Sequence, residues 1–192
     1  EQVWAGSNSA YGEVWWFYCS TASNQVDKYV IWNYQENLWY TGSLDRSTWI
    51  DSGTYPLPYA TKYDGTNSTL FIHESGKDDD GSTLTSFIES GDFDIGDGDD
   101  IMFVNKLIPD FKNQVGNVNI TLKSRYFPTD TQTSKGPFRY NTTSSKINTR
   151  TRGRQIAVRL ESNGFNNINN DATGEDWRLG TLRFEVQPDG KR

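Results

Sequence analysis

The sequence predicts an all-β protein with almost no helix, folded as a propeller-blade-like antiparallel meander followed by a β-sandwich-like unit. Aromatic residues make up 14% of the chain, and they gather with β-branched residues in short runs, which favour strands. Glycine, asparagine and aspartate separate these runs, as is typical of tight turns. No segment longer than about ten residues has the periodicity of an amphipathic helix. The pattern therefore indicates strands joined by short loops.

The predicted meander comprises three aromatic runs, at residues 13–20, 28–34 and 38–42, which are separated by polar turns. Strand pairs of this kind, with a short turn and a tryptophan, resemble the blades of a β-propeller. A lone blade has two open edges and cannot bury both faces, so we expect further blades before Glu1. The only methionine is Met102, which also predicts a fragment of a longer protein.

A second hairpin is predicted from residues 56–63 and 68–75, because the turn between them contains an Asp-Gly pair. The stretch 77–83 follows, and it is too polar to pack in a core. We expect it to form a solvated loop at the boundary between two domains. The predicted domains are the aromatic-rich meander at residues 1–80 and the sandwich-like unit at residues 81–192.

The predicted sandwich-like unit shows apolar-polar alternation, which gives a strand with one face in the core. This alternation places Val118, Ile120 and Leu122 on one strand face, and Ile147, Thr149 and Thr151 on another. Two loops are predicted, at 127–145 with a short strand inside it at 137–141, and at 163–176. The other expected strands lie at 85–95, 100–111, 155–162 and 177–190.

An acidic turn in the second half of the chain holds the densest group of ionisable residues: Asp92, Asp94, Asp97, Asp99 and Asp100. Carboxylates on a glycine-kinked loop are ligands that calcium prefers, although the spacing lacks the twelfth-position glutamate of an EF-hand. A solvated acidic turn between strands is therefore favoured over a calcium site. No other cofactor is predicted.

A basic run contains Arg150, Arg152 and Arg154 at alternate positions of a predicted strand. Guanidinium groups in such a row suit carboxylates or phosphates. The formal net charge of -6 opposes nonspecific attraction to nucleic acid. We therefore expect the row to pair with acidic loops of the same fold or of a neighbouring subunit, and these arginines are the candidate subunit contacts.

The tryptophans and tyrosines of the meander are candidates for a sugar-stacking platform, because aromatic faces pack against pyranose rings. These residues are Trp15, Trp16, Trp32, Trp39 and Tyr40. Aromatic residues at strand spacing are more often part of the core. A carbohydrate-binding module that recognises a cell-surface or environmental glycan is kept as the alternative function.

Catalytic motifs are not evident in the sequence. His73 is the only histidine, and Cys19 has no partner nearby in the sequence for nucleophilic catalysis. A glycosidase needs only two carboxylates, and no spacing pairs the glutamates that were considered: Glu13, Glu36, Glu74 and Glu89. No apolar window is long enough to cross a bilayer. We expect a protein without enzymatic activity and without a membrane anchor.

Several segments, taken together in their order along the chain, resemble those of a known family. These segments are residues 13–20, 27–51, 88–104, 105–111, 152–163 and 177–192. Together they resemble the C-terminal region of tail nozzle and hub-type structural proteins of short-tailed phages. The resemblance implies a virion location in the phage tail, with other subunits of a tail ring and neighbouring tail proteins as partners. It also implies that DNA passes the protein only in transit and non-specifically, and that no catalytic residues are present.

Overall fold

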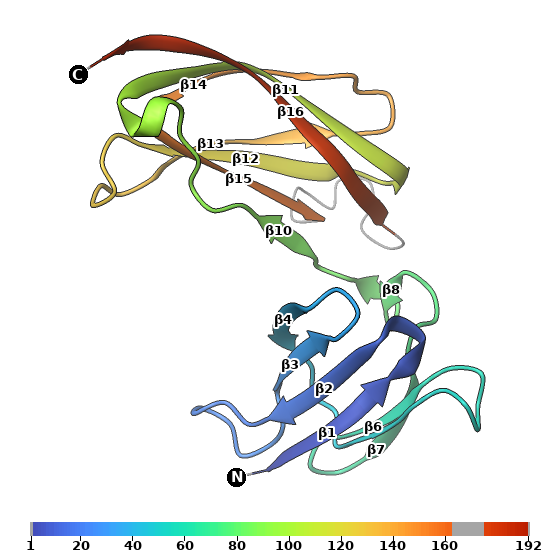
Figure 1. Ribbon diagram of the computed structural model, residues 1–192. Helices are drawn as coiled ribbons and strands as arrows, with labels where there is room; N and C mark the ends of the chain where they lie inside the picture. The colour runs from blue at the N-terminus through green and yellow to red at the C-terminus, as the bar shows by residue number, and fades with distance from the viewer. Residues whose placement is uncertain (1, 163–174, 192) are drawn as a thin grey trace. The chain divides into compact units, whose positions relative to one another are not determined.

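The protein is nearly all β in this computed structural model, which describes residues 2–162 and 175–191 (Figure 1). All strand pairs in this part of the chain are antiparallel, and the described helices are two single 3-10 turns, Ser9–Tyr11 and Gly96–Gly98. The predicted all-β class with almost no helix is confirmed. Most of the loop predicted at 163–176 lies outside the described residues.

Two compact units make up the chain, Glu1–Ser75 and Gly76–Arg192, and each is described by itself. The polar stretch 77–83 belongs to the second unit and contains a short hairpin of β8 (Asp78–Asp79) and β9 (Ser82–Thr83). Within the described residues, no helix combines the length and the apolar composition that crossing a membrane requires.

The first unit begins with a four-stranded antiparallel meander. Its strands, in sheet order, are β1 (Val3–Asn8), β2 (Glu13–Tyr18), β3 (Lys28–Asn33) and β4 (Leu38–Ser43). A second sheet contains β5 (Thr48–Ile50), β6 (Tyr59–Tyr63) and β7 (Ser68–Ile72). The sequence did not predict β1 or β5, because neither segment shows a long apolar run.

Aromatic rings form the core between these two sheets. Trp15 and Phe17 alternate on β2 toward the second sheet, where the ring of Trp49 lies 5.1 and 5.9 Å from their centroids. A Cβ at Gly6 would lie 2.7 Å from the Trp49 ring, so only glycine lets the indole approach β1 this closely. The chain itself therefore covers one face of the predicted blade with β5–β7.

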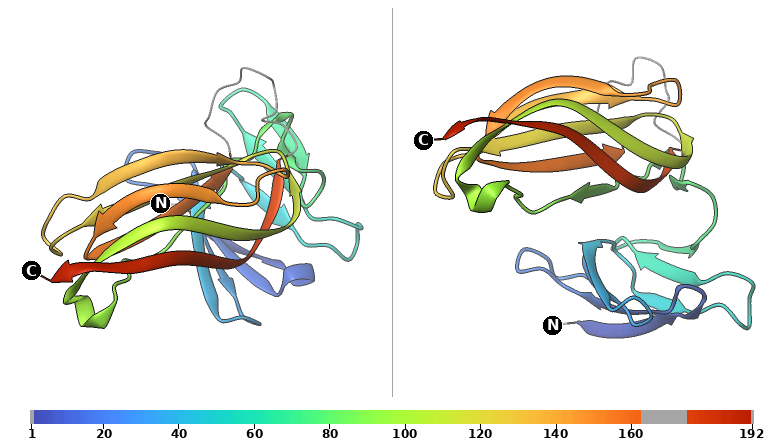
Figure 2. Two further views of the ribbon diagram at one scale, coloured as in Figure 1. Left: turned by 90° about the horizontal axis from the view of Figure 1, so that it is seen from above. Right: turned by 45° about the horizontal axis from the view of Figure 1, so that its top comes forward.

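The second unit is a β-sandwich of two antiparallel sheets (Figure 1, Figure 2). One sheet has the order β10 (Phe87–Glu89), β15 (Gln155–Ser162), β12 (Val118–Arg125) and β13 (Thr133–Tyr140). The other has the order β14 (Ile147–Gly153), β11 (Asp100–Val115) and β16 (Asp176–Lys191). The core contains the predicted Val118, Ile120 and Leu122, all fully buried.

The predicted strand that contains Ile147 and the expected strand at 155–162 follow each other closely in the chain, but they belong to different sheets. On β14 the alternation buries Ile147, Thr149 and Thr151, as the pattern indicated. The chain then changes sheet at Gly153, where a Cβ would lie 3.0 Å from the Ser124 side chain. The corner passes too close to β12 for a side chain to fit without a shift.

The segment 127–145 also differs from expectation, because β13 spans eight residues instead of a short strand at 137–141. It pairs with β12 along most of its length, with a register shift between Ile120 and Leu122. The shift lies opposite Gly136 and Pro137, where proline cannot donate a ladder hydrogen bond. Pairing with the preceding strand β12, which the composition of 127–145 does not reveal, extends this polar strand.

Candidate functional site

The candidate sugar-stacking residues separate onto two faces of the meander. Trp32 and Trp39 are direct cross-strand partners and share one face. Trp15 and Tyr40 are both partners of Ile31, which is buried, so they belong to the opposite face. The structure therefore does not bring the five candidate residues together on one face.

A line of aromatic rings nevertheless occupies the face that β5–β7 do not cover, and we call it the tryptophan face. It consists of Trp16, Trp32, Trp39 and Tyr34. Trp39 stacks on Trp16 and on Trp32 with ring centroids 5.9 and 6.0 Å apart, and Tyr34 meets Trp32 edge-on at 6.1 Å. The Trp39 side chain is 62% exposed. Three strands thus present a continuous aromatic surface.

Beside this face, β4 forms an edge of the meander sheet. It pairs with β3 in regular register, and no other described strand pairs with its outer side. Leu38, Trp39 and Tyr40 are consecutive and all exposed, and none of the six residues of β4 carries a charge. An uncharged apolar edge strand with unpaired backbone groups is a template for pairing with another strand.

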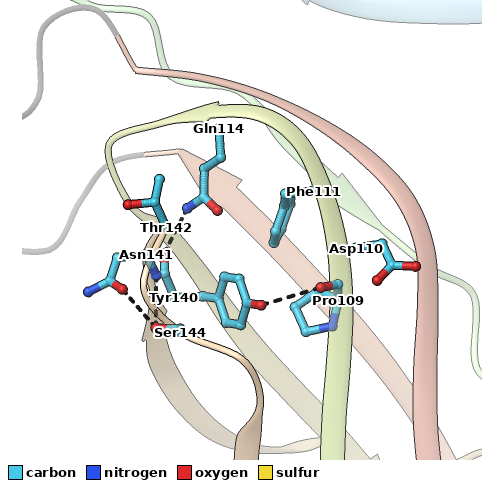
Figure 3. A pocket seen from close by; sticks show the side chains of 8 residues that line it. All are labelled: Pro109, Asp110, Phe111, Gln114, Tyr140, Asn141, Thr142 and Ser144. Atoms are coloured by element: carbon cyan, nitrogen blue, oxygen red, sulfur yellow. Dashed lines mark hydrogen bonds between the residues drawn. The ribbon is translucent and has the colours of Figure 1, made fainter.

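The second unit contains a pocket of about 490 Å³ between the end of β11 and the turn after β13 (Figure 3). Its lining consists of Pro109, Asp110, Phe111, Gln114, Tyr140, Asn141, Thr142 and Ser144. In Figure 3 the rings of Phe111 and Tyr140 lie in the middle, with polar side chains along one side. The centroids of the two rings are 5.5 Å apart.

Hydrogen bonds hold the polar wall of this pocket in place. Nε2 of Gln114 donates to the carbonyl oxygens of Gly116 and Tyr140, both at 3.1 Å. Oδ1 of Asn141 accepts from the backbone and hydroxyl of Thr143 and from the hydroxyl of Ser144. The Tyr140 hydroxyl donates to the Pro109 carbonyl at 3.4 Å. Burial and the charge of Asp110 raise the pKa of Tyr140, so the hydroxyl stays protonated.

The three predicted contact arginines do not form one row. Arg150 and Arg152 are exposed on the outer face of β14. The guanidinium of Arg152 is bound within the unit, because Nε lies 2.6 Å from the Asp189 carboxylate and Nη2 donates to the Asp189 carbonyl. Arg154 lies between β14 and β15, and its Nε donates to the carbonyl of Gly98 at 2.7 Å. Of the three, Arg150 alone has no side-chain partner among the described residues.

The aspartates of the acidic turn are also dispersed. Asp92 forms an ion pair with Arg125 and accepts a hydrogen bond of 2.9 Å from Gln132. Asp97 adopts a left-handed conformation in the 3-10 turn Gly96–Gly98, and Asp100 lies 4.0 Å from the Lys191 amine. In residues 2–162 and 175–191, no three histidine, cysteine or carboxylate side chains come together as a metal site.

Two of the four candidate glutamates do meet. Nδ2 of Asn8 donates to Glu74 at 2.9 Å and to Glu13 at 3.5 Å, and Nε1 of Trp15 donates to Glu13 at 2.9 Å. Burial raises the pKa of Glu13, and the charge of Glu74 adds to the effect. Both carboxylates face one fully buried amide, which makes the pair a polar contact at the edge of the core.

His73 contributes to the packing of the first unit. Its Nε2 accepts a hydrogen bond of 2.9 Å from Nε of Arg46, and its ring lies 4.8 Å from the ring of Trp49. The Arg46 side chain is buried and lies over the Phe71 ring at 4.1 Å. The histidine therefore supports a buried arginine in the aromatic core.

Sequence reasoning missed the pocket residues Gln114, Asn141 and Thr142 entirely. Gln114 belongs to an irregular end of β11, where the register with β16 shifts and Asn113 has a positive φ. No local pattern indicates that this end meets the turn after β13. Tyr34 was also missed, although its position two residues after Trp32 places it on the same strand face.

No protein-family model matches this chain, and no curated protein is significantly similar to it. The function must therefore be argued from the two units themselves.

Proposed function

We propose that the chain is a non-enzymatic structural protein of a phage tail, of the nozzle or hub type, which assembles through subunit contacts around a DNA-exit channel. The observation that carries the assembly part is the uncharged, exposed edge strand β4. The resemblance of the ordered sequence segments supports the virion part. The protein would meet other ring subunits and neighbouring tail proteins, and DNA only in transit.

The edges of the second unit show how this chain protects strands that should stay unpaired. Those edge strands are very short, or they carry charges, prolines or register shifts. Strand β10 has only three residues. The charged residues and prolines on the other edges are Lys135, Pro137 and Arg139 on β13, Arg150 and Arg152 on β14, and Arg183, Glu185 and Pro188 on β16. Natural sheets use these devices against edge-to-edge association. Their absence from β4 supports β4 as the assembling edge, and we commit to a second copy of this chain as its partner.

Sedimentation velocity over a range of protein concentrations tests the assembly. The wild-type chain is expected to associate as its concentration rises. The double variant Leu38→Lys/Tyr40→Lys places two charges on the edge and is expected to remain monomeric. The matched control Val115→Lys/Tyr126→Lys adds the same charge at two exposed positions of the second unit and should associate like the wild type.

A wild-type chain that stays monomeric, or a β4 variant that associates as strongly as the control, would overturn the assembly role. The virion assignment has its own test in the genomic neighbourhood of the parent gene. Capsid, portal or tail genes on either side are expected, and a neighbourhood without virion genes would contradict a phage-tail origin.

A carbohydrate-binding module is the second candidate, and the tryptophan face favours it. Aromatic faces in line can stack against successive sugar rings, and Trp39 is exposed between Trp16 and Trp32. Saturable binding of a polysaccharide, lost in Trp39→Ala but kept in Leu38→Lys/Tyr40→Lys, would support this function. Failure of every polysaccharide on a glycan array would remove it.

A further inference from the structure

The pocket of the second unit has the size of a small-molecule site. Its volume is about 490 Å³, within the roughly 300–1,000 Å³ that ligand pockets occupy. Phe111, Tyr140 and Pro109 supply an apolar wall, and the polar lining comes from β11 and from the turn after β13. This combination of aromatic rings with a few oriented polar groups is typical of sites that bind small polar molecules.

The polar groups that remain free in this pocket include both donors and acceptors. Both Nε2 bonds of Gln114 go to carbonyl oxygens, so its Oε1 has no partner among the described residues. Asn141 uses its Oδ1 within the turn and leaves Nδ2 unused. The exposed Thr142 adds a hydroxyl that can donate or accept. A free amide oxygen, a free amide nitrogen and a hydroxyl thus line one wall.

The charge of the pocket narrows the class of ligand further. Among the described lining residues the one carboxylate is Asp110, which pairs with Arg183 and points away from the rings in Figure 3. The lining residues within 2–162 and 175–191 include no lysine or arginine, so an anion would find no cation among them to balance it. A cation would meet one carboxylate that is already neutralised. The site therefore suits an uncharged ligand.

We propose that this pocket binds a neutral, polyhydroxylated molecule of the size of a monosaccharide or disaccharide. The half-buried ring of Phe111 would pack against its C–H face, next to the buried ring of Tyr140. Oε1 of Gln114 and Nδ2 of Asn141 would bind neighbouring hydroxyls, because each hydroxyl can both donate and accept. The site is separate from β4 and from the tryptophan face, so it goes beyond the assembly role and does not depend on it.

Saturation-transfer NMR and isothermal titration of the whole chain with a panel of neutral monosaccharides and disaccharides test this site. At least one sugar is expected to bind saturably, whereas inorganic phosphate is not. Asn141→Asp removes the free donor but keeps an oxygen for the turn, and we expect at least a tenfold loss of affinity. Phe111→Leu removes the ring while keeping an apolar side chain, and a similar loss is expected.

The control is Asn148→Asp, which makes the same chemical change at an exposed position on β14. It should bind the sugar as the wild type does. Binding of no sugar at millimolar concentration would overturn the proposal, as would equal losses in Asn141→Asp and Asn148→Asp. Sugar binding that is lost with Trp39→Ala but kept with Asn141→Asp would also overturn it, because the ligand would then occupy the tryptophan face.

Discussion

The first unit packs aromatic rings against one another, whereas the second unit packs aliphatic side chains between its sheets. Trp15, Phe17 and Trp49 stack in the first core, while Leu107, Ile120 and Leu160 are among the buried residues of the second. Most buried indole N–H groups find a partner, although that of Trp4 has none among the described residues. Nε1 of Trp49 donates to the Ser7 carbonyl at 2.7 Å, and the Trp15 indole donates to Glu13.

This difference explains where the two units keep their charges. The aromatic core includes a buried arginine, Arg46, and borders the half-buried Glu13. The sandwich places its ion pairs on outer strand faces, such as Glu89 with Lys123 and Arg159. A core of rings with polar groups thus accommodates charged side chains at its margin, whereas in the aliphatic sandwich the charged side chains lie at the surface.

The largest expected effect on stability comes from removing a buried leucine of the second unit. Leu107→Ala creates a cavity in the aliphatic core, where the side chain is fully buried, and should lower the free energy of unfolding by about 2–5 kcal/mol. Leu70→Ala makes the same change at a side chain that is 63% exposed in the first unit. It should change stability by less than about 0.5 kcal/mol. Calorimetric unfolding of both variants checks this, and equal effects would contradict the burial difference.

An intermediate effect tests the buried charge of the first unit. Arg46→Ala leaves the His73 ring nitrogen without its donor and the Phe71 ring without its cation, and should cost about 1–3 kcal/mol. Arg150→Ala removes an exposed arginine from β14, and a change below about 0.5 kcal/mol is expected. Urea denaturation measures both. An Arg150 variant that is as damaging as the Arg46 variant would show that the outer arginine has a structural role.

The smallest expected effect is the pH dependence of folding stability, which has opposite signs at Glu89 in the second unit and Glu13 in the first. Hydrogen bonds from Lys123 and Arg159 lower the pKa of Glu89. Its stabilisation is therefore present above the unfolded-state pKa and is lost as the pH falls through the lower folded value. Burial and Glu74 raise the pKa of Glu13. The folded state then holds that proton more tightly, so stability declines as the pH rises from the unfolded value through the raised one.

Melting temperatures of two variants across acidic to neutral pH separate these contributions. Glu89→Gln should be less stable than the wild type at neutral pH, by about 0.5–1 kcal/mol, and equal to it in strong acid. Glu13→Gln should be slightly more stable at neutral pH, since the amide oxygen still accepts from Trp15 without repelling Glu74. Glu36→Gln, on an exposed turn, is the control. A stability change of the same sign in Glu89→Gln and Glu13→Gln at neutral pH would contradict the opposite pKa shifts of the two glutamates.

Much of the fold could be predicted because strand alternation is a local property. Ile147, Thr149 and Thr151 alternate in the sequence and are buried in the structure. The aromatic runs of the meander became β2, β3 and β4 at the expected places. Where alternation is absent, as in β1 and β13, strand formation depends on pairing with the neighbouring strand of a hairpin, β2 or β12, which stabilises the backbone. Those strands were missed or shortened.

The candidate sites could be predicted only in part, because a site needs residues from separate strands to meet. Trp15 and Trp16 are neighbours in the sequence, yet one packs on Trp49 and the other stacks on Trp39. Only the register with β3 and β4 shows which of them joins the tryptophan face. The pocket combines an irregular end of β11 with the turn after β13, two strands later in the chain.

The sequence by itself determined the all-β class, the meander and the turns, since each follows from spacing two residues apart and from residues that favour tight turns. The tertiary structure decided that β5–β7 cover one face of the meander, that the chain changes sheet at Gly153, and that Gln114 faces Asn141. These features depend on pairing and packing between residues far apart in the chain, and such contacts have no local signature.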